Sequence, residues 1–114
     1  MKENIVKTKS FDFSLMIIAM YKQLQEQKEF IISIQLLRSG TSIGANIEEA
    51  LAGISKRDFT AKMSISSKEA RETNYWLRLL KASNLTDISV EKELKESEDL
   101  INILTKIVKT SQGR

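Results

Sequence analysis

Histidine and cysteine are both absent from this chain of 114 residues, so any chemistry must come from carboxylates, hydroxyls, amines and guanidinium groups. Without histidine the chain lacks the commonest general base, and without cysteine it lacks a thiol nucleophile and any disulfide. No glycine-rich phosphate loop occurs, and no serine is accompanied by an evident base. The sequence therefore contains no catalytic constellation, and we expect neither an enzyme activity nor a cofactor.

One group of residues that could do chemistry is acidic. The glutamates at 48, 49, 69 and 72 would approach one another if the two helices that carry them lie side by side. Di-iron sites in four-helix bundles also use histidines in Glu-x-x-His motifs, which this chain lacks. Because buried acids are usually paired, we expect these carboxylates to bind a base and no metal. The alternative is a carboxylate-bound metal enzyme, with a magnesium site held by carboxylates alone as one form of it. The buried polar network that we predict consists of Arg38, Glu49, Glu69 and Glu72.

A second group is basic and belongs to the segment 56–81, which contains seven bases and three acids. Its members recur at helical spacing, so they share one side of a helix. A basic stripe that contains an aromatic ring can contact phosphates and stack on a base, whereas the alternative is an ordinary solvated helix face. The residues predicted to bind nucleic acid are Arg57, Lys68, Arg71, Tyr75 and Arg78.

Charge and hydropathy limit the partners and the location. Eighteen basic and fifteen acidic residues give a net charge of +3, which is compatible with a nucleic-acid partner. The longest apolar run, residues 15–21, is much too short to span a bilayer. We therefore expect no membrane partner and a cytoplasmic location.

The fold follows from the absence of proline and the small number of glycines, which is four. This composition favours a few long helices, and short polar connections between them predict antiparallel neighbours. The expected fold is an all-α, up-down-up-down bundle with helices at about 10–26, 29–52, 56–82 and 89–110. Residues 1–9 are expected to form a flexible basic arm, with Ser10 capping the first helix. Residues 10–110 then form one domain and 111–114 a frayed tail.

The segment 37–50 contains an unusual number of small residues for the middle of a long helix. Gly40 and Gly44 stack on one helix face, and each costs about 1 kcal/mol relative to alanine. Such glycines let another backbone come close. Apolar side chains point all around the first helix, and the second helix has two apolar stripes, so both helices are expected to be covered on two sides and the protein to self-associate. The residues predicted for close packing or an oligomer contact are Gly40, Ile43, Gly44 and Ile47.

Three blocks of this sequence resemble the bacterial four-helix-bundle proteins related to those encoded by intervening sequences of large-subunit ribosomal RNA genes. The first block is LRSGTSIGANIEEA at 37–50. The second comprises SKRDF at 55–59 and KMSI at 62–65, and the third is KEARETNYWLRLL at 68–80. One departure is Gly44, where many members carry proline.

The resemblance implies an antiparallel four-helix bundle that assembles into a ring, typically a homopentamer, and it brings no catalytic residues. A relative of similar fold, the accessory variability determinant of diversity-generating retroelements, works with a reverse transcriptase and RNA. By analogy, we expect a non-enzymatic ring that associates with RNA, DNA or a nucleoprotein. The alternative is a scaffold that binds another protein and no nucleic acid.

Overall fold

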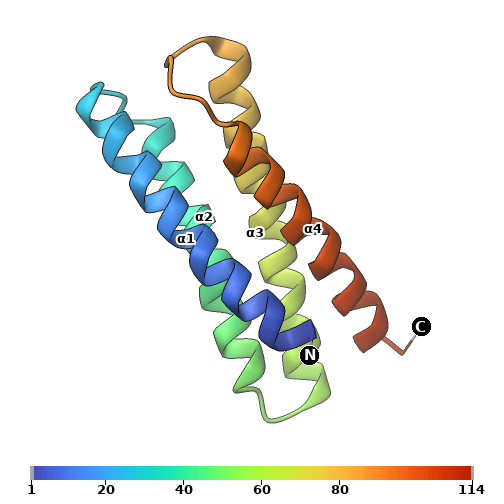
Figure 1. Cartoon of the computed structure of the whole chain (residues 1–114). Helices are drawn as coiled ribbons and strands as arrows, with labels where there is room; N and C mark the ends of the chain where they lie inside the picture. The colour runs from blue at the N-terminus through green and yellow to red at the C-terminus, as the bar shows by residue number, and fades with distance from the viewer. Residues whose placement is uncertain (1, 114) are drawn as a thin grey trace.

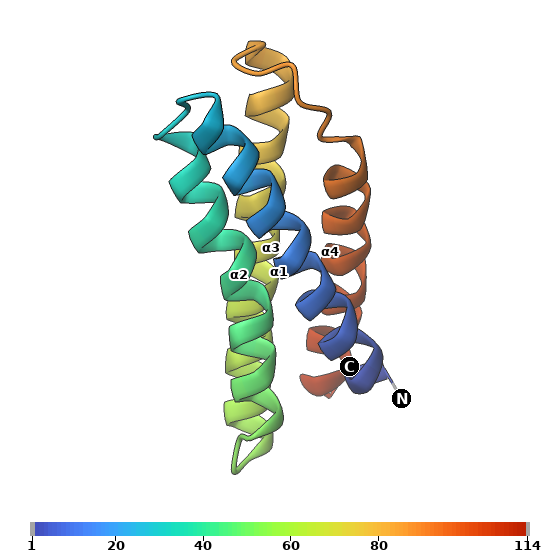
Figure 2. The ribbon, with the colours of Figure 1, turned by 60° about the vertical axis from the view of Figure 1, so that its left-hand side comes forward.

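Four helices account for nearly all of the computed structural model, which describes residues 2–113 and their side chains from residue 5 onward. They are α1 (Lys2–Glu26), α2 (Ile32–Leu51), α3 (Lys56–Ser83) and α4 (Glu91–Ser111). Each helix packs against the next along the chain, and α4 closes the bundle against α1 (Figure 1). In a second view α1 runs obliquely across the bundle (Figure 2). The structure confirms the antiparallel four-helix bundle.

The core is built from residues spaced three or four apart, which bring one stripe of each helix to the bundle axis. Phe13, Ile17 and Leu24 of α1 and Leu36 of α2 are almost entirely shielded from solvent, as are Leu77 of α3 and Leu100 and Leu104 of α4. The long axis of the bundle measures 44 Å, and the two short axes measure 21 Å each. No helix within residues 2–113 is long and apolar enough to cross a membrane.

The start of α1 differs from the prediction. A flexible arm over residues 1–9 was expected, but the helix begins at Lys2, and Met1 lies outside the described residues. Val6 and Ser10 are buried, so packing against the bundle extends the helix beyond the point where its sequence indicates a cap. The Ser10 hydroxyl donates to the Lys7 carbonyl (3.0 Å) and caps nothing.

The other helix ends follow local side-chain chemistry. Helix α2 begins at Ile32, three residues later than expected, because the Glu29 carboxylate accepts hydrogen bonds from the N–H groups of the first turn, including that of Ser33 at 2.6 Å. Helix α3 begins where predicted, with the Ser55 hydroxyl accepting from the Asp58 N–H at 3.1 Å. Asn84 ends α3 in the left-handed conformation, with φ 58°. Helix α4 begins at Glu91 and reaches Ser111, slightly displaced from 89–110.

Small polar residues join α2 to α3 in the interior. The Ser66 hydroxyl donates to the Ile43 carbonyl at 2.8 Å, and the Thr73 hydroxyl donates to the Ser39 hydroxyl at 2.8 Å. All three hydroxyl-bearing side chains are fully buried. Small side chains allow the two backbones to come close, and each hydroxyl finds a partner that replaces water.

The two helical glycines face α1 of the same chain. A Cβ atom on Gly40 would lie 2.8 Å from Ile17 Cγ2, and one on Gly44 would lie 3.3 Å from Ser10 Oγ. Ile43 and Ile47 are fully buried in the core. The close packing predicted for these four residues is present, but it is used inside the bundle. Because Gly40, Ile43 and Ile47 are buried within the single chain, they are not exposed for the oligomer contact that formed the other part of the prediction.

Candidate nucleic-acid interface

The five residues of the predicted basic stripe lie on the outer face of α3. Arg57, Lys68, Arg71, Tyr75 and Arg78 are all exposed, on the side of the helix opposite the buried Ser66, Ala70, Thr73 and Leu77. None of the four bases is in an ion pair with a described residue. From Arg57 to Arg78 the row extends about 31 Å along the helix. We call this row the basic face.

Neutral groups hold two of the arginines in place. Arg71 Nη2 donates to Thr105 Oγ1 of α4 at 2.9 Å. Arg78 Nε donates to Asn74 Oδ1 at 2.8 Å, and its guanidinium lies 5.8 Å from the centre of the Tyr75 ring. These contacts position the cations and leave their charge uncompensated, so each can still bind an anion. The contact between Arg71 and Thr105 could not be predicted from the sequence, because it depends on how α3 and α4 are aligned.

Two acids in the first half of α4 form ion pairs with lysines that do not belong to the basic face. Glu96 pairs with Lys9 of α1 at 3.2 Å, and Glu91 pairs with Lys81 near the end of α3 at 2.8 Å. Neither of these two pairs involves a base of the basic face.

The predicted polar network forms only in part. Arg38 of α2 pairs with Glu69 of α3 at 3.3 Å and with Glu72, which also accepts from Trp76 Nε1 at 2.9 Å. Glu49 lies about 16 Å further along α2, too far to join, and it pairs instead with Lys62 at 2.7 Å. The network is also less buried than predicted, since the Arg38 side chain is 49% exposed. Nowhere among the described side chains, those of residues 5–113, are three acidic groups arranged as metal ligands would be.

Replacing Arg38 by alanine is expected to lower the free energy of unfolding by about 1 kcal/mol, because it leaves two carboxylates one turn apart without their shared cation. Urea denaturation measures the loss. Screening predicts that the loss shrinks in about 1 M salt. Lys68→Ala is the matched control, since Lys68 is exposed and makes no ion pair with a described residue. Equal losses for the two variants would contradict a stabilising network.

An apolar surface lies on the opposite side of the bundle, across α1 and α2. Phe11 and Leu15 are 61% and 54% exposed, and Ile34 of α2 is 52% exposed. The Lys7–Glu48 pair, at 3.8 Å, aligns α1 with α2 and brings Phe11 level with the exposed Ala45. We call Phe11, Leu15, Ile34 and Ala45 the α1–α2 surface.

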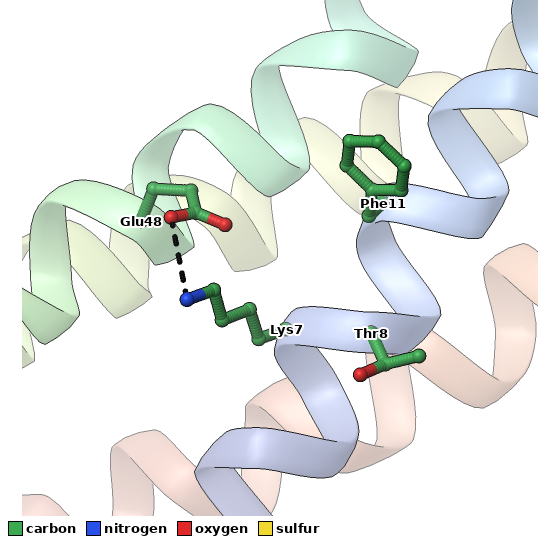
Figure 3. A pocket seen from close by; sticks show the side chains of 4 residues that line it. All are labelled: Lys7, Thr8, Phe11 and Glu48. Carbon is green, nitrogen blue, oxygen red and sulfur yellow. Dashed lines mark ion pairs between the residues drawn. The ribbon is translucent and has the colours of Figure 1, made fainter.

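A hollow of about 550 Å³ opens at one end of the α1–α2 surface, lined by Lys7, Thr8, Phe11 and Glu48 (Figure 3). Of these four residues, the sequence singled out only Glu48, as one of the four candidate glutamates. The sequence feature that could have indicated this surface is the first helix, because its apolar side chains point in every direction and some must remain exposed.

A comparison with models of protein families gives a match that covers nearly the whole chain. Residues 2–110 match the model of the 23S rRNA-intervening sequence protein family, a span that includes α1 to α3 and nearly all of α4. The chain belongs to this family. The resemblance inferred from the three sequence blocks is thus confirmed, and it extends over almost the whole chain. No curated protein sequence matches the chain.

A solved structure agrees with the fold of this 23S rRNA-intervening sequence protein family member. It is the crystal structure of a protein of unknown function from the S23 ribosomal protein family of Bacteroides thetaiotaomicron. The two chains are 48% identical, with a TM-score of 0.88, and the match covers 96% of this chain and 99% of the other. The comparison supports the fold.

Proposed function

We propose that this protein is a non-enzymatic, cytoplasmic helical bundle that binds RNA or DNA, free or within a nucleoprotein, through the basic face of α3. The observation that carries the proposal is a row of four exposed bases, Arg57, Lys68, Arg71 and Arg78, for which the described residues provide no acidic partner. The name of the family refers to intervening sequences of 23S rRNA, which makes RNA the first ligand to test.

The geometry of the basic face suits a phosphate backbone. Its length of about 31 Å equals the rise of about nine base pairs at 3.4 Å each. Arginines bind phosphate oxygens through two parallel hydrogen bonds, and Arg71 and Arg78 are already positioned by neutral partners. Tyr75 lies within the row, where its ring can stack on an unpaired base. These contacts are sequence-independent, so we expect affinity without strong sequence preference.

Fluorescence anisotropy with labelled RNA and DNA of mixed sequence tests the proposal. Binding is expected at about 50 mM salt and should weaken steeply towards about 200 mM, because each phosphate contact releases counterions. An absence of binding to both nucleic acids at about 50 mM salt would overturn the proposal.

We also propose that copies of the protein associate through the α1–α2 surface, with the pentameric ring implied by the family resemblance as the expected assembly. Large exposed side chains such as Phe11, Leu15 and Ile34 are costly to leave in water when they gather on one side. Because α1 and α2 lie opposite α3 and α4, association here leaves the basic face of every copy open. Several basic faces in one assembly would raise the positive potential and the affinity for a long polyanion.

The variant Leu15→Glu is expected to convert the assembly to monomers, since it places a charge in the middle of the α1–α2 surface. Size-exclusion chromatography with light scattering measures the mass at micromolar concentration. Leu85→Glu is the matched control, because Leu85 is 56% exposed but lies in the loop after α3. A wild-type protein that is already a uniform monomer would contradict self-association.

The α1–α2 surface also favours a second candidate function, a scaffold that binds another protein and no nucleic acid. The exposed Phe11 and Leu15 could be covered by a partner protein in the same way as by a second copy. A pull-down after nuclease treatment separates the two functions. A stable protein partner recovered from a chain that fails the anisotropy test would favour the scaffold.

A further inference from the structure

A second hollow lies where the start of α3 meets the end of α4. Its volume is about 490 Å³. The Thr60 and Ser111 hydroxyls contact each other there and so join the two helices. In Figure 1 this is the lower end of the bundle, where α3 begins and α4 ends. The residues that line the hollow are Lys56, Arg57, Thr60, Ala61, Ser111 and Gln112.

The hollow is lined by basic side chains without an acidic partner among the described residues and by apolar surface. Lys56 and Arg57 are exposed and belong to no ion pair among the described residues. The nearest acid in sequence, Asp58, lies towards the α2–α3 connection, since its Cβ would be 3.3 Å from a Cβ on Gly53. The methyl group of Ala61 and the aliphatic stems of the two bases provide surface on which a sugar or a base can pack. The site therefore suits an anion attached to a partly apolar group.

We infer that this hollow receives the phosphorylated end of a nucleic-acid strand that lies along the basic face, an inference that rests on the proposed function. Arg57 belongs both to the basic face and to the hollow, so a bound strand would lead directly into it. The basic face ends there, because α3 begins at Lys56. A terminal phosphate monoester carries a charge of about −1.5 to −2 at pH 7, against −1 for a phosphate within the strand. Two unpaired cations match the terminal group better.

Three RNA strands of one sequence test this inference, with a 5′-phosphate, with a 3′-phosphate, or with hydroxyl groups at both ends. We expect one phosphorylated strand to bind about tenfold more tightly than the hydroxyl strand, because it adds charge-assisted hydrogen bonds. The comparison between the 5′ and 3′ arms identifies which end enters the hollow. Equal affinity for all three strands would overturn the inference and leave the proposed function intact. Failure of all three to bind would overturn both.

Two variants locate the effect. Lys56→Ala removes a cation that is not part of the basic face, and Ala61→Phe fills the hollow without changing the charge. Both should abolish the tenfold preference and change the affinity for the hydroxyl strand by no more than about twofold. Lys92→Ala, at an exposed lysine near the other end of α4, should retain the preference. Thermal melts establish that the variants are folded. A preference that persists in both folded variants would place the terminal phosphate elsewhere and contradict the inference.

Discussion

Replacing Lys68, Arg71 and Arg78 together by alanine is expected to weaken the binding of a mixed-sequence RNA strand by about 100-fold at 0.1 M salt. Each lost phosphate contact on a single strand reduces the slope of log K against log salt by about 0.7, so three contacts reduce it by about 2. The three side chains are exposed and contribute little to the core. We therefore expect the thermal midpoint to change by only a few degrees.

The measurement is a salt titration of binding by fluorescence anisotropy. The matched control replaces Lys22, Lys28 and Lys92 by alanine, which changes the net charge equally at exposed positions outside the basic face. If both triple variants lost the same affinity, binding would depend on total charge and the basic face would have no special role. The position of the bases is thus tested separately from their number.

The second large effect concerns stability. Gly40→Leu is expected to lower the free energy of unfolding by about 3 kcal/mol or more and the thermal midpoint by about 10 °C or more. The gain of about 1 kcal/mol in helix propensity cannot offset the clash, because even a Cβ atom would lie 2.8 Å from Ile17 Cγ2. Urea denaturation with an unchanged m-value would establish that the native state alone is affected.

Two further variants connect this effect to Ile17. Gly44→Ala should change stability by no more than about 1 kcal/mol, since its Cβ would lie 3.3 Å from the Ser10 hydroxyl and helix propensity improves. Ile17→Ala combined with Gly40→Leu should cost less than the sum of the two single changes, because the smaller side chain makes room for the leucine. Strict additivity would show that the contact between Gly40 and Ile17 does not determine the loss.

The basic face shows how far local periodicity can be used. Its exposed position followed from the sequence because a seam of small and apolar residues marks the inner side of α3, and the bases recur on the opposite side. Glu49 shows the limit. Its type and helix suggested a partner near Arg38, but the alignment of α2 against α3 places it beside Lys62. That alignment depends on packing along the whole interface, which a single sequence does not reveal.

The sequence by itself determined the number and order of the helices, the starting point of α3, the polar side of α3 and the family. These features depend on residues close together in the chain, on spacing, caps and the absence of proline. Tertiary structure decided where α1 begins, which helix the glycines contact and which side remains apolar. Gly40 and Gly44 indicate a close approach but are compatible with either a second copy or the same chain. Only the burial of Ile17 and Ser10 against them assigns that approach to α1 and leaves Phe11 and Leu15 exposed.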